Sequence, residues 1–146
     1  MYPEKRLELV HFQLTRNCNL RCPFCGQWGG KGFFSNACGE GMTIDDWKRV
    51  TDELNAYSQN TGIKPSVILW GGEPLVFPYF REIAEYLRAD SFELGLITNG
   101  VFIDKYIDFL THDFKKIYVS VDGPQDIHDK IRGVGVFEKV QNNVRL

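Results

Sequence analysis

The sequence lacks the features by which membrane and nucleic-acid-binding proteins are usually recognised. No apolar run approaches the roughly 20 residues that a transmembrane helix needs. The charged start of the chain, Met-Tyr-Pro-Glu-Lys-Arg, is not followed by the apolar segment of a signal peptide. Lysine and arginine form no basic block, and the formal net charge is only −2. We therefore expect neither nucleic acid nor a membrane surface as a partner.

Cysteine is scarce, and it is unevenly distributed. The chain has four cysteines, of which Cys18, Cys22 and Cys25 are bunched and only Cys38 stands apart, in a glycine-rich stretch. Closely bunched cysteines do not easily pair with one another, so we expect no disulfide framework. Such cysteine usage is typical of a reducing compartment, which predicts a cytoplasmic protein.

Linkers, internal repeats and shifts of composition are also missing. The 146 residues are 43% hydrophobic and 25% charged, which is ordinary for a globular chain with a real core. We therefore treat residues 1–146 as one domain.

Short apolar segments alternate with segments of helical periodicity. Residues 66–70 form a continuous apolar run, as in a strand buried on both faces. Residues 43–60 repeat apolar side chains at helical spacing behind Thr43, a predicted N-cap. By the same criteria strands are predicted at 7–15, 66–70, 92–98 and 116–121, and helices at 43–60, 78–87, 103–110 and from 137 onward.

The alternation predicts an α/β fold of parallel βα repeats with right-handed crossovers. Four such units are half of a closed eightfold barrel. Each candidate motif lies at or just beyond the end of a predicted strand: the cysteine cluster, Gly71-Gly72-Glu73-Pro74, Thr98-Asn99-Gly100 and Ser120-Val121-Asp122-Gly123. The carboxyl ends of parallel strands are where such folds place their sites, so we expect these motifs to meet.

The three bunched cysteines indicate a metal centre. Thiolates are soft ligands for iron and zinc, and closely spaced thiolates can reach a single centre. Three are one short of the four that close a structural zinc or ferredoxin-type site, so a cubane cluster held here keeps one iron open for chemistry. The alternatives are a zinc site that takes Cys38 as its fourth ligand, and three thiols without metal.

The cysteine spacing, with Phe24 before the last cysteine, resembles the signature of the radical S-adenosylmethionine (radical SAM) superfamily, and the later motifs continue the resemblance through most of the chain. The resemblance implies that Cys18, Cys22 and Cys25 bind a [4Fe–4S] cluster. It implies that the reduced cluster cleaves S-adenosylmethionine (AdoMet) to a 5′-deoxyadenosyl radical, which abstracts hydrogen from a substrate. It also implies a partial (β/α)6 barrel, of which this chain holds the N-terminal four units and lacks the last ones.

The same resemblance implies a set of AdoMet-binding residues. They are Phe24 near the adenine, Gly71, Gly72, Glu73 and Pro74 for the amino group, Thr98 and Asn99 along the pocket, and Ser120, Asp122 and Arg132 for the ribose or carboxylate. Other readings stay open. Gly-Gly-Glu-Pro is also an ordinary strand-to-helix turn, and Asp122-Gly-Pro is also an Asx-type turn. Arg132 is equally suited to a surface salt bridge with Asp126 or Asp129. For His128 a structural hydrogen bond is favoured over a catalytic role.

The pattern of Asp122-Gly, His128 and Arg132-Gly resembles the radical SAM subgroup with C-terminal auxiliary-cluster (SPASM or twitch) domains. Members of that subgroup commonly modify peptides or proteins, or mature cofactors. The resemblance thus implies a peptide or protein substrate and a reductant such as flavodoxin or ferredoxin. The alternative function is a structural or redox metal-binding module, with iron–sulfur or zinc, that lacks AdoMet chemistry.

Overall fold

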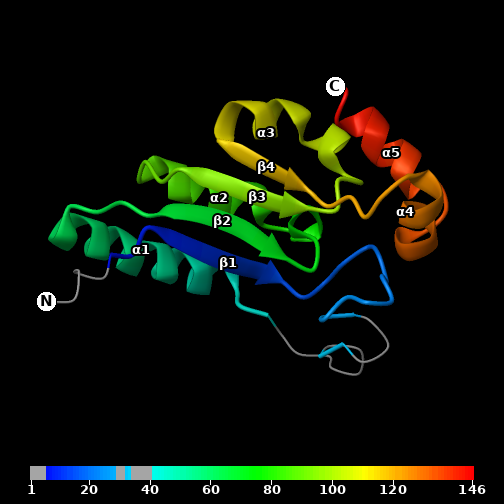
Figure 1. The fold of residues 1–146 in the computed structure, drawn as a ribbon. Coiled ribbons are helices and arrows are strands. Elements are labelled where there is room, and N and C mark those ends of the chain that lie inside the picture. The colour runs from blue at the N-terminus through cyan, green and yellow to red at the C-terminus, as the bar shows by residue number, and fades with distance from the viewer. Residues whose placement is uncertain (1–5, 29–31, 34–40) are drawn as a thin grey trace, which may run out of the picture.

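The computed structural model describes residues 6–28, 32–33 and 41–146, so Cys38 lies outside the described residues. Four strands form one parallel sheet in the order β1-β2-β3-β4 (Figure 1). They are β1 (Leu9–Thr15), β2 (Ser66–Gly71), β3 (Leu94–Thr98) and β4 (Lys116–Val119). Helices α1 (Ile44–Thr61), α2 (Phe80–Ala89) and α3 (Ile107–Asp113) connect them. The predicted α/β fold of parallel βα units is confirmed.

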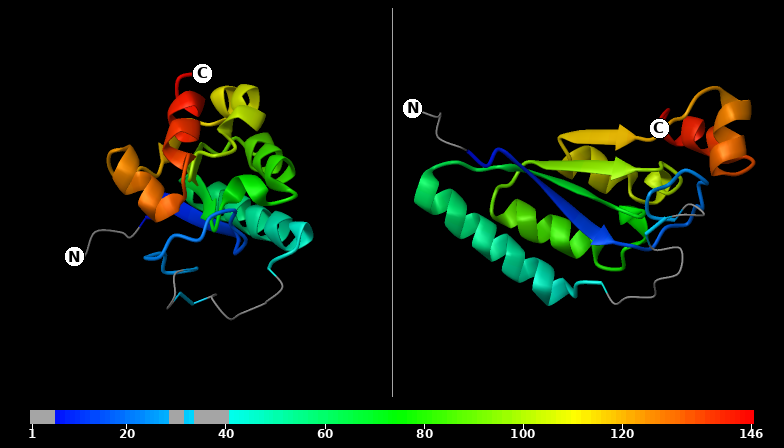
Figure 2. Two further views of the ribbon diagram at one scale, coloured as in Figure 1. Left: turned by 90° about the vertical axis from the view of Figure 1, so that its right-hand side faces the viewer. Right: turned by 60° about the horizontal axis from the view of Figure 1, so that its bottom comes forward.

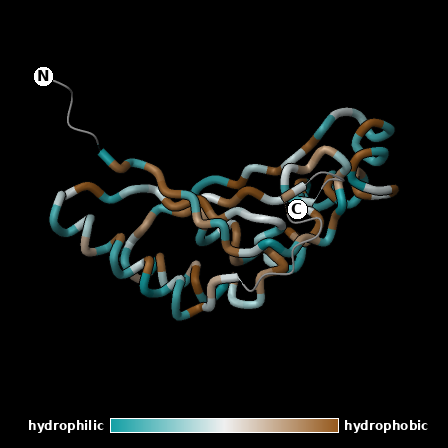
Figure 3. Tube along the Cα trace, turned by 90° about the horizontal axis from the view of Figure 1, so that it is seen from below, coloured by the Kyte–Doolittle hydropathy of each residue, from teal (hydrophilic) through white to brown (hydrophobic). Residues whose placement is uncertain are grey.

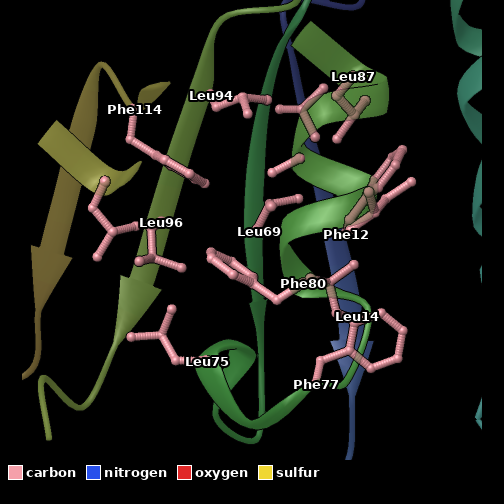
Figure 4. Packing of buried hydrophobic residues seen from close by; sticks show 14 of the residues in the cluster. Phe12, Leu14, Leu69, Leu75, Phe77, Phe80, Leu87, Leu94, Leu96 and Phe114 are labelled. Carbon is pink, nitrogen blue, oxygen red and sulfur yellow. The ribbon is translucent and has the colours of Figure 1, made fainter. Parts of the chain in front are cut away.

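One face of the sheet carries the core. Phe12, Leu69 and Leu96 point from their strands toward the helices, and Phe80 of α2 packs among them (Figure 4). All four side chains are buried. The rings of Phe80 and Phe114 stack with centroids 5.8 Å apart, which adds aromatic contact to the burial of apolar area. The opposite face is less covered, since Leu9 and Tyr118 are exposed there.

Helix α1 follows its predicted boundaries closely because its N-terminus is capped. Thr43 Oγ1 accepts from the Asp46 N–H at 3.2 Å, while the Asp46 carboxylate accepts from the Thr43 N–H at 2.9 Å. This reciprocal capping box satisfies two backbone donors that a helix otherwise leaves free. Hydrophobic and hydrophilic residues alternate along α1 (Figure 3), and its inward side buries Trp47 and Leu54 against the sheet.

Two helices follow β4, where the sequence predicted one. The last, α5 (Val136–Asn143), corresponds to the helix expected from 137 onward. Helix α4 (Gln125–Arg132) was missed. Its apolar residues are only Ile127 and Ile131, and the single side chain that it buries is His128, so its apolar stripe is too short to mark a helix in the sequence. Both helices sit beyond the carboxyl ends of the strands (Figures 1 and 2).

Element boundaries differ from the predictions mainly around prolines and strand ends. Strand β3 begins at Leu94 rather than at 92, and β4 ends at Val119 rather than at 121. The helix predicted at 78–87 is α2, which begins at Phe80, and a 3₁₀ turn at Pro74–Val76 precedes it. The helix predicted at 103–110 is a 3₁₀ turn at Ile103–Lys105 followed by α3.

The parallel arrangement brings all four strand ends to one side of the molecule. The cysteine loop after β1, the turns after β2 and β3, and helix α4 after β4 gather there (Figures 1 and 2). Within the described part of the chain, every helix is too short or too polar to cross a bilayer.

Candidate functional site

A pocket of about 190 Å³ opens at the carboxyl ends of the strands. Ten of the residues predicted from the sequence line it: Cys18, Cys22, Phe24, Cys25, Gly71, Gly72, Thr98, Asn99, Ser120 and Arg132. Leu20 and Ile97 also line it; they are ordinary apolar residues, and no sequence signal marks them. Three predicted residues, Glu73, Pro74 and Asp122, do not line the pocket.

The cysteine loop is held by contacts within itself. The N–H of Cys25 donates to the carbonyl of Cys22 at 3.0 Å, which closes a tight turn between these two cysteines. The Arg21 guanidinium donates to the carbonyl of Cys18 at 2.6 Å and lies 4.5 Å from the centre of the Trp28 ring. Phe24 is 63% exposed at the rim. The loop therefore presents its sulfur atoms and one aromatic ring to the pocket.

Burial raises the pKa of the Cys18 and Cys22 thiols above the ordinary value. The positive charge of Arg132 opposes this effect at Cys22. A metal centre binds thiolates, so its assembly must displace protons from these thiols, and the cation beside Cys22 favours that exchange.

The three thiols surround the pocket without converging on one point. Cys18, Cys22 and Cys25 are unpaired. As the side chains lie, no group of three His, Cys, Asp or Glu among the described residues could hold a metal ion. A zinc ion needs its sulfur ligands within about 2.3 Å of one point, whereas each thiolate of a cubane binds a different iron. The donor set therefore fits an iron–sulfur cluster by its chemistry and by its place around one pocket.

The two glycines after β2 allow a close approach between backbones. A Cβ atom on Gly71 would lie 2.4 Å from the carbonyl oxygen of Thr15, and one on Gly72 would lie 2.2 Å from that of Asn17. The N–H of Gly72 donates to Thr15 and that of Glu73 to Asn17, both at 2.8 Å. The atoms that these glycines approach therefore belong to the end of β1 and the start of the cysteine loop.

Glu73 is completely buried, and its carboxylate is occupied by protein donors. Oε1 accepts from the hydroxyl of Thr98 at 2.7 Å and from the N–H of Leu75 at 3.1 Å, and Oε2 accepts from the N–H of Asn99 at 2.7 Å. Burial raises the pKa of this carboxyl above its ordinary value, against the effect of these hydrogen bonds. Glu73 therefore joins the turn after β2 to the end of β3.

Asn99 reaches from the end of β3 to the cysteine loop. Its Nδ2 donates to Asn19 Oδ1 at 2.8 Å and lies 3.9 Å from Cys18 Sγ. Its Oδ1 accepts from the N–H of Val101 at 3.0 Å. Asn99 thus caps the turn after β3 and also contacts a predicted metal ligand.

Arg132 of α4 is paired with Asp122, not with Asp126 or Asp129. Its Nη2 donates to Asp122 Oδ1 at 3.1 Å, and its Nε donates to Oδ2. This bidentate pair lowers the pKa of the Asp122 carboxyl. Asp129 instead accepts from the N–H groups of Gly135 and Phe137 at 2.9 and 2.8 Å. Both surface salt bridges considered for Arg132 are wrong.

His128 has the structural hydrogen bond expected of it. The side chain is fully buried, and its Nδ1 accepts from the Asp122 N–H at 3.4 Å. Its ring packs edge-on against that of Phe137, with centroids 5.6 Å apart. His128 therefore supports the segment that carries Asp122 and does not line the pocket.

Sequence reasoning missed one further anchor of the cysteine loop. The Gln27 Nε2 donates to the carbonyl of Gly71 at 3.2 Å, which joins the end of the loop to the glycine turn. Its position two residues after Cys25 gave no chemical signal.

Comparison with known proteins places this chain in a family. Residues 12–146 match the model of the radical SAM superfamily. The chain is 35% identical over 142 residues to the AdoMet-dependent heme synthase of Methanosarcina barkeri, covering 94% of this chain and 38% of that protein. It is 28% identical over 136 residues to the sporulation killing factor maturation protein SkfB of Bacillus subtilis, covering 91% and 31%.

Solved structures agree in fold. The native anSMEcpe structure with bound AdoMet superposes with a TM-score of 0.74 at 24% identity, covering 96% of this chain and 41% of that one. Streptococcus suis SuiB bound to its precursor peptide SuiA gives 0.66 at 20% identity, covering 88% and 27%.

The chain belongs to the radical SAM superfamily, whose members use a [4Fe–4S] cluster and AdoMet. It spans less than half the length of these relatives.

Proposed function

We propose that this chain is the N-terminal part of the core domain of a radical SAM enzyme. The observation that carries the proposal is that three unpaired thiols from one loop share a pocket with the glycine turn, Asn99 and Arg132 at the carboxyl ends of the strands. We propose that the last βα units of the core belong to residues beyond this chain, because the relatives that this chain matches are more than twice as long.

In this proposal Cys18, Cys22 and Cys25 hold a [4Fe–4S] cluster, which, when bound and reduced, supplies the electron that cleaves AdoMet to a 5′-deoxyadenosyl radical. The residues of this chain bind and orient. Arg132 offers a guanidinium suited to the AdoMet carboxylate, and the exposed ring of Phe24 offers an apolar surface to the adenine. Ser120, at the end of β4, offers a hydroxyl to the ribose or carboxylate.

The surroundings of Glu73 support a proposal for the group that contacts the AdoMet ammonium. Glu73 ends the glycine turn, but its carboxylate faces protein donors and not the pocket. Gly71 and Gly72 do line the pocket. We therefore assign contact with the ammonium group to the backbone of this turn, and to Glu73 and Pro74 the task of holding the turn in place.

The substrate that we propose is a peptide or protein. Two facts support it: the Asp-Gly…His…Arg-Gly pattern, and the likeness to SuiB, solved with a precursor peptide, and to the maturation protein SkfB. The likeness to a heme synthase makes a tetrapyrrole the substrate to test against it. We further propose a flavodoxin or ferredoxin as reductant and a reducing, cytoplasmic setting, which keeps thiols reduced.

The test is the iron and sulfide content of the full chain after anaerobic reconstitution, together with electron paramagnetic resonance of the reduced protein with and without AdoMet. We expect about four iron and four sulfide per chain, as a cubane holds, and a signal that changes when AdoMet is added. A cluster that is blind to AdoMet, or zinc in place of iron, would contradict the proposal.

Two cysteine variants separate the proposal from a four-cysteine metal module. Cys22→Ala should lose the cluster, because one of three ligands is gone. Cys38→Ala should keep the cluster and the response to AdoMet. Equal loss of metal in both variants would favour the metal-binding module.

A further inference from the structure

The side chain of Asn99 is held in one orientation by its neighbours. The N–H of Val101 needs an acceptor, which Asn99 Oδ1 supplies at 3.0 Å. The amide nitrogen then faces the cysteine loop, where Asn19 Oδ1 takes one of its two hydrogens at 2.8 Å. The second hydrogen is left for Cys18 Sγ, 3.9 Å from the nitrogen. Long donor–acceptor distances are usual at sulfur because the atom is large.

The backbone of Asn99 is held as firmly as its side chain. Its N–H donates to Glu73 Oε2 at 2.7 Å, and the preceding Thr98 hydroxyl donates to Oε1 at the same distance. Glu73 is fully buried, so water does not compete for these hydrogen bonds. A path of hydrogen bonds thus runs from the turn after β2, through Glu73 and Asn99, to a sulfur atom of the cysteine loop.

Two donors of different origin face Cys18 Sγ. The N–H of Leu20 lies 3.4 Å away and belongs to the cysteine loop itself, so it moves with the sulfur. Asn99 is 81 residues distant in sequence and belongs to the sheet. It is therefore the donor that ties the position and the electrostatics of this thiolate to the rigid part of the fold.

We propose that Asn99 is a positioning residue for the iron–sulfur cluster, which orients Cys18 and raises the reduction potential of the cluster by donating an N–H to its sulfur. The inference rests on the proposed function, because it needs a cluster bound at Cys18. Reduction adds negative charge to the cluster and its thiolates, and a hydrogen bond to sulfur stabilises that charge. Removing the donor therefore makes the cluster harder to reduce.

The experiment is a redox titration of the reconstituted full chain, followed by electron paramagnetic resonance. Asn99→Ala removes every contact of the amide. Asn99→Ser introduces no charge, and its hydroxyl still offers an acceptor to the Val101 N–H, since serine makes turns of the same kind. The shorter serine side chain cannot reach Cys18. In both variants we expect the midpoint potential to fall below that of the wild type.

Asn143 provides a matched control on the same turn. It is buried and donates to the carbonyls of Gly100 and Val101, at 2.8 and 3.1 Å, from the side of α5. Asn143→Ala loosens the turn after β3 without removing a donor from Cys18. We expect it to lower the thermal stability and to leave the midpoint potential at the wild-type value.

Each outcome decides the matter. A wild-type potential in Asn99→Ser, or an equal shift in Asn143→Ala, would overturn the inference. If the Asn99 variants bind no cluster while their circular dichroism is unchanged and Asn143→Ala loads normally, the positioning role is supported. If the wild-type chain itself takes up no iron and sulfide, the proposed function fails, and that failure is visible before any variant is compared.

Discussion

The carboxylate of Asp122 accepts two hydrogen bonds from the guanidinium of Arg132. Of these two residues, only Arg132 lines the pocket. The two residues were both expected to contact AdoMet, but the pairing gives them different tasks. Asp122 fixes the plane of the guanidinium, and Arg132 presents its positive charge beside Cys22. The anionic end of a ligand then meets a cation that is already oriented.

Replacing Asp122 should therefore destabilise the fold. The side chains of Arg132 and Asp122 are only 12% and 17% exposed, so water cannot readily take over the lost bonds. We expect Asp122→Asn to lower the free energy of unfolding by about 2 kcal/mol, as for hydrogen bonds between charged groups. Urea denaturation at pH 7 measures this. Glu85→Gln, exposed on α2, is the control and should stay near the wild type; equal losses in both would contradict the assignment.

The same pair predicts a pH dependence. Hydrogen bonding to Arg132 lowers the pKa of Asp122 in the folded protein. The stability that the Asp122 carboxylate contributes to the fold is therefore complete above the ordinary pKa of about 3.9. It is lost as the pH falls through the lowered pKa. The stability gap between wild type and Asp122→Asn should be constant from pH 7 to about pH 5 and should shrink below about pH 4. A gap that persists unchanged at the acid end would show that Asp122 acts through shape and not through charge.

Glu73→Gln should also be destabilising, although it removes a buried charge. All donors that face the carboxylate are N–H or O–H groups, and a glutamine must turn its NH₂ toward one of them. The unpaired donor costs about 1–3 kcal/mol. Burial raises the pKa of Glu73, which shows that its charge is unfavourable there, and removing that charge offsets part of the cost. We expect a net loss of about 1 kcal/mol in urea denaturation. A glutamine variant more stable than the wild type would mean that burial of the charge outweighs the hydrogen bonds.

Gly72→Ala tests the contact between the glycine turn and the cysteine loop. The new Cβ would meet the carbonyl oxygens of Asn17 and Arg16, at 2.2 and 2.7 Å. Relieving this overlap moves backbone at the start of the loop, with an expected cost of about 1–3 kcal/mol and a lower iron content. Gly26→Ala lies in the same loop and meets nothing within 4 Å, so it should load iron as the wild type does. Normal iron and stability in Gly72→Ala would refute the close approach.

Thr43→Ala tests the cap of α1. Hydrogen bonds from the Thr43 side chain and backbone, with Arg49 nearby, lower the pKa of Asp46 to about 2. Without the hydroxyl, the pKa should rise toward the ordinary value of about 3.9, and the chain should lose thermal stability. The stabilisation from Asp46 is present above about pH 4 and is lost as the pH falls through about 2. Carboxyl chemical shifts followed through an acid titration measure the pKa. A value that stays at about 2 in the variant would assign the effect to the backbone N–H of residue 43 and to Arg49.

Sequence patterns determined the elements that depend on local physics. The apolar run at 66–70 and the capped helical stripe after Thr43 each produced the element expected of them, because burial of an apolar face and satisfaction of helix ends are set by neighbours in sequence. Parallel order then followed from alternation, and with it the meeting of the motifs at one end of the sheet. The cysteine spacing likewise placed three thiols on one pocket.

Tertiary structure alone decided which atoms these residues contact. Besides one local backbone N–H each, Glu73 and Asn99 have partners that lie 25 to 81 residues away, and only the pairing of the strands brings these together. For that reason no local pattern could show that Glu73 faces protein donors, that the glycines approach the cysteine loop, or that Asp122 holds Arg132. Helix α4 was missed for a related reason: what stabilises it is one buried histidine and a turn fixed by Asp129. The sequence by itself determined the chemistry available at the site, and the fold determined how that chemistry is held.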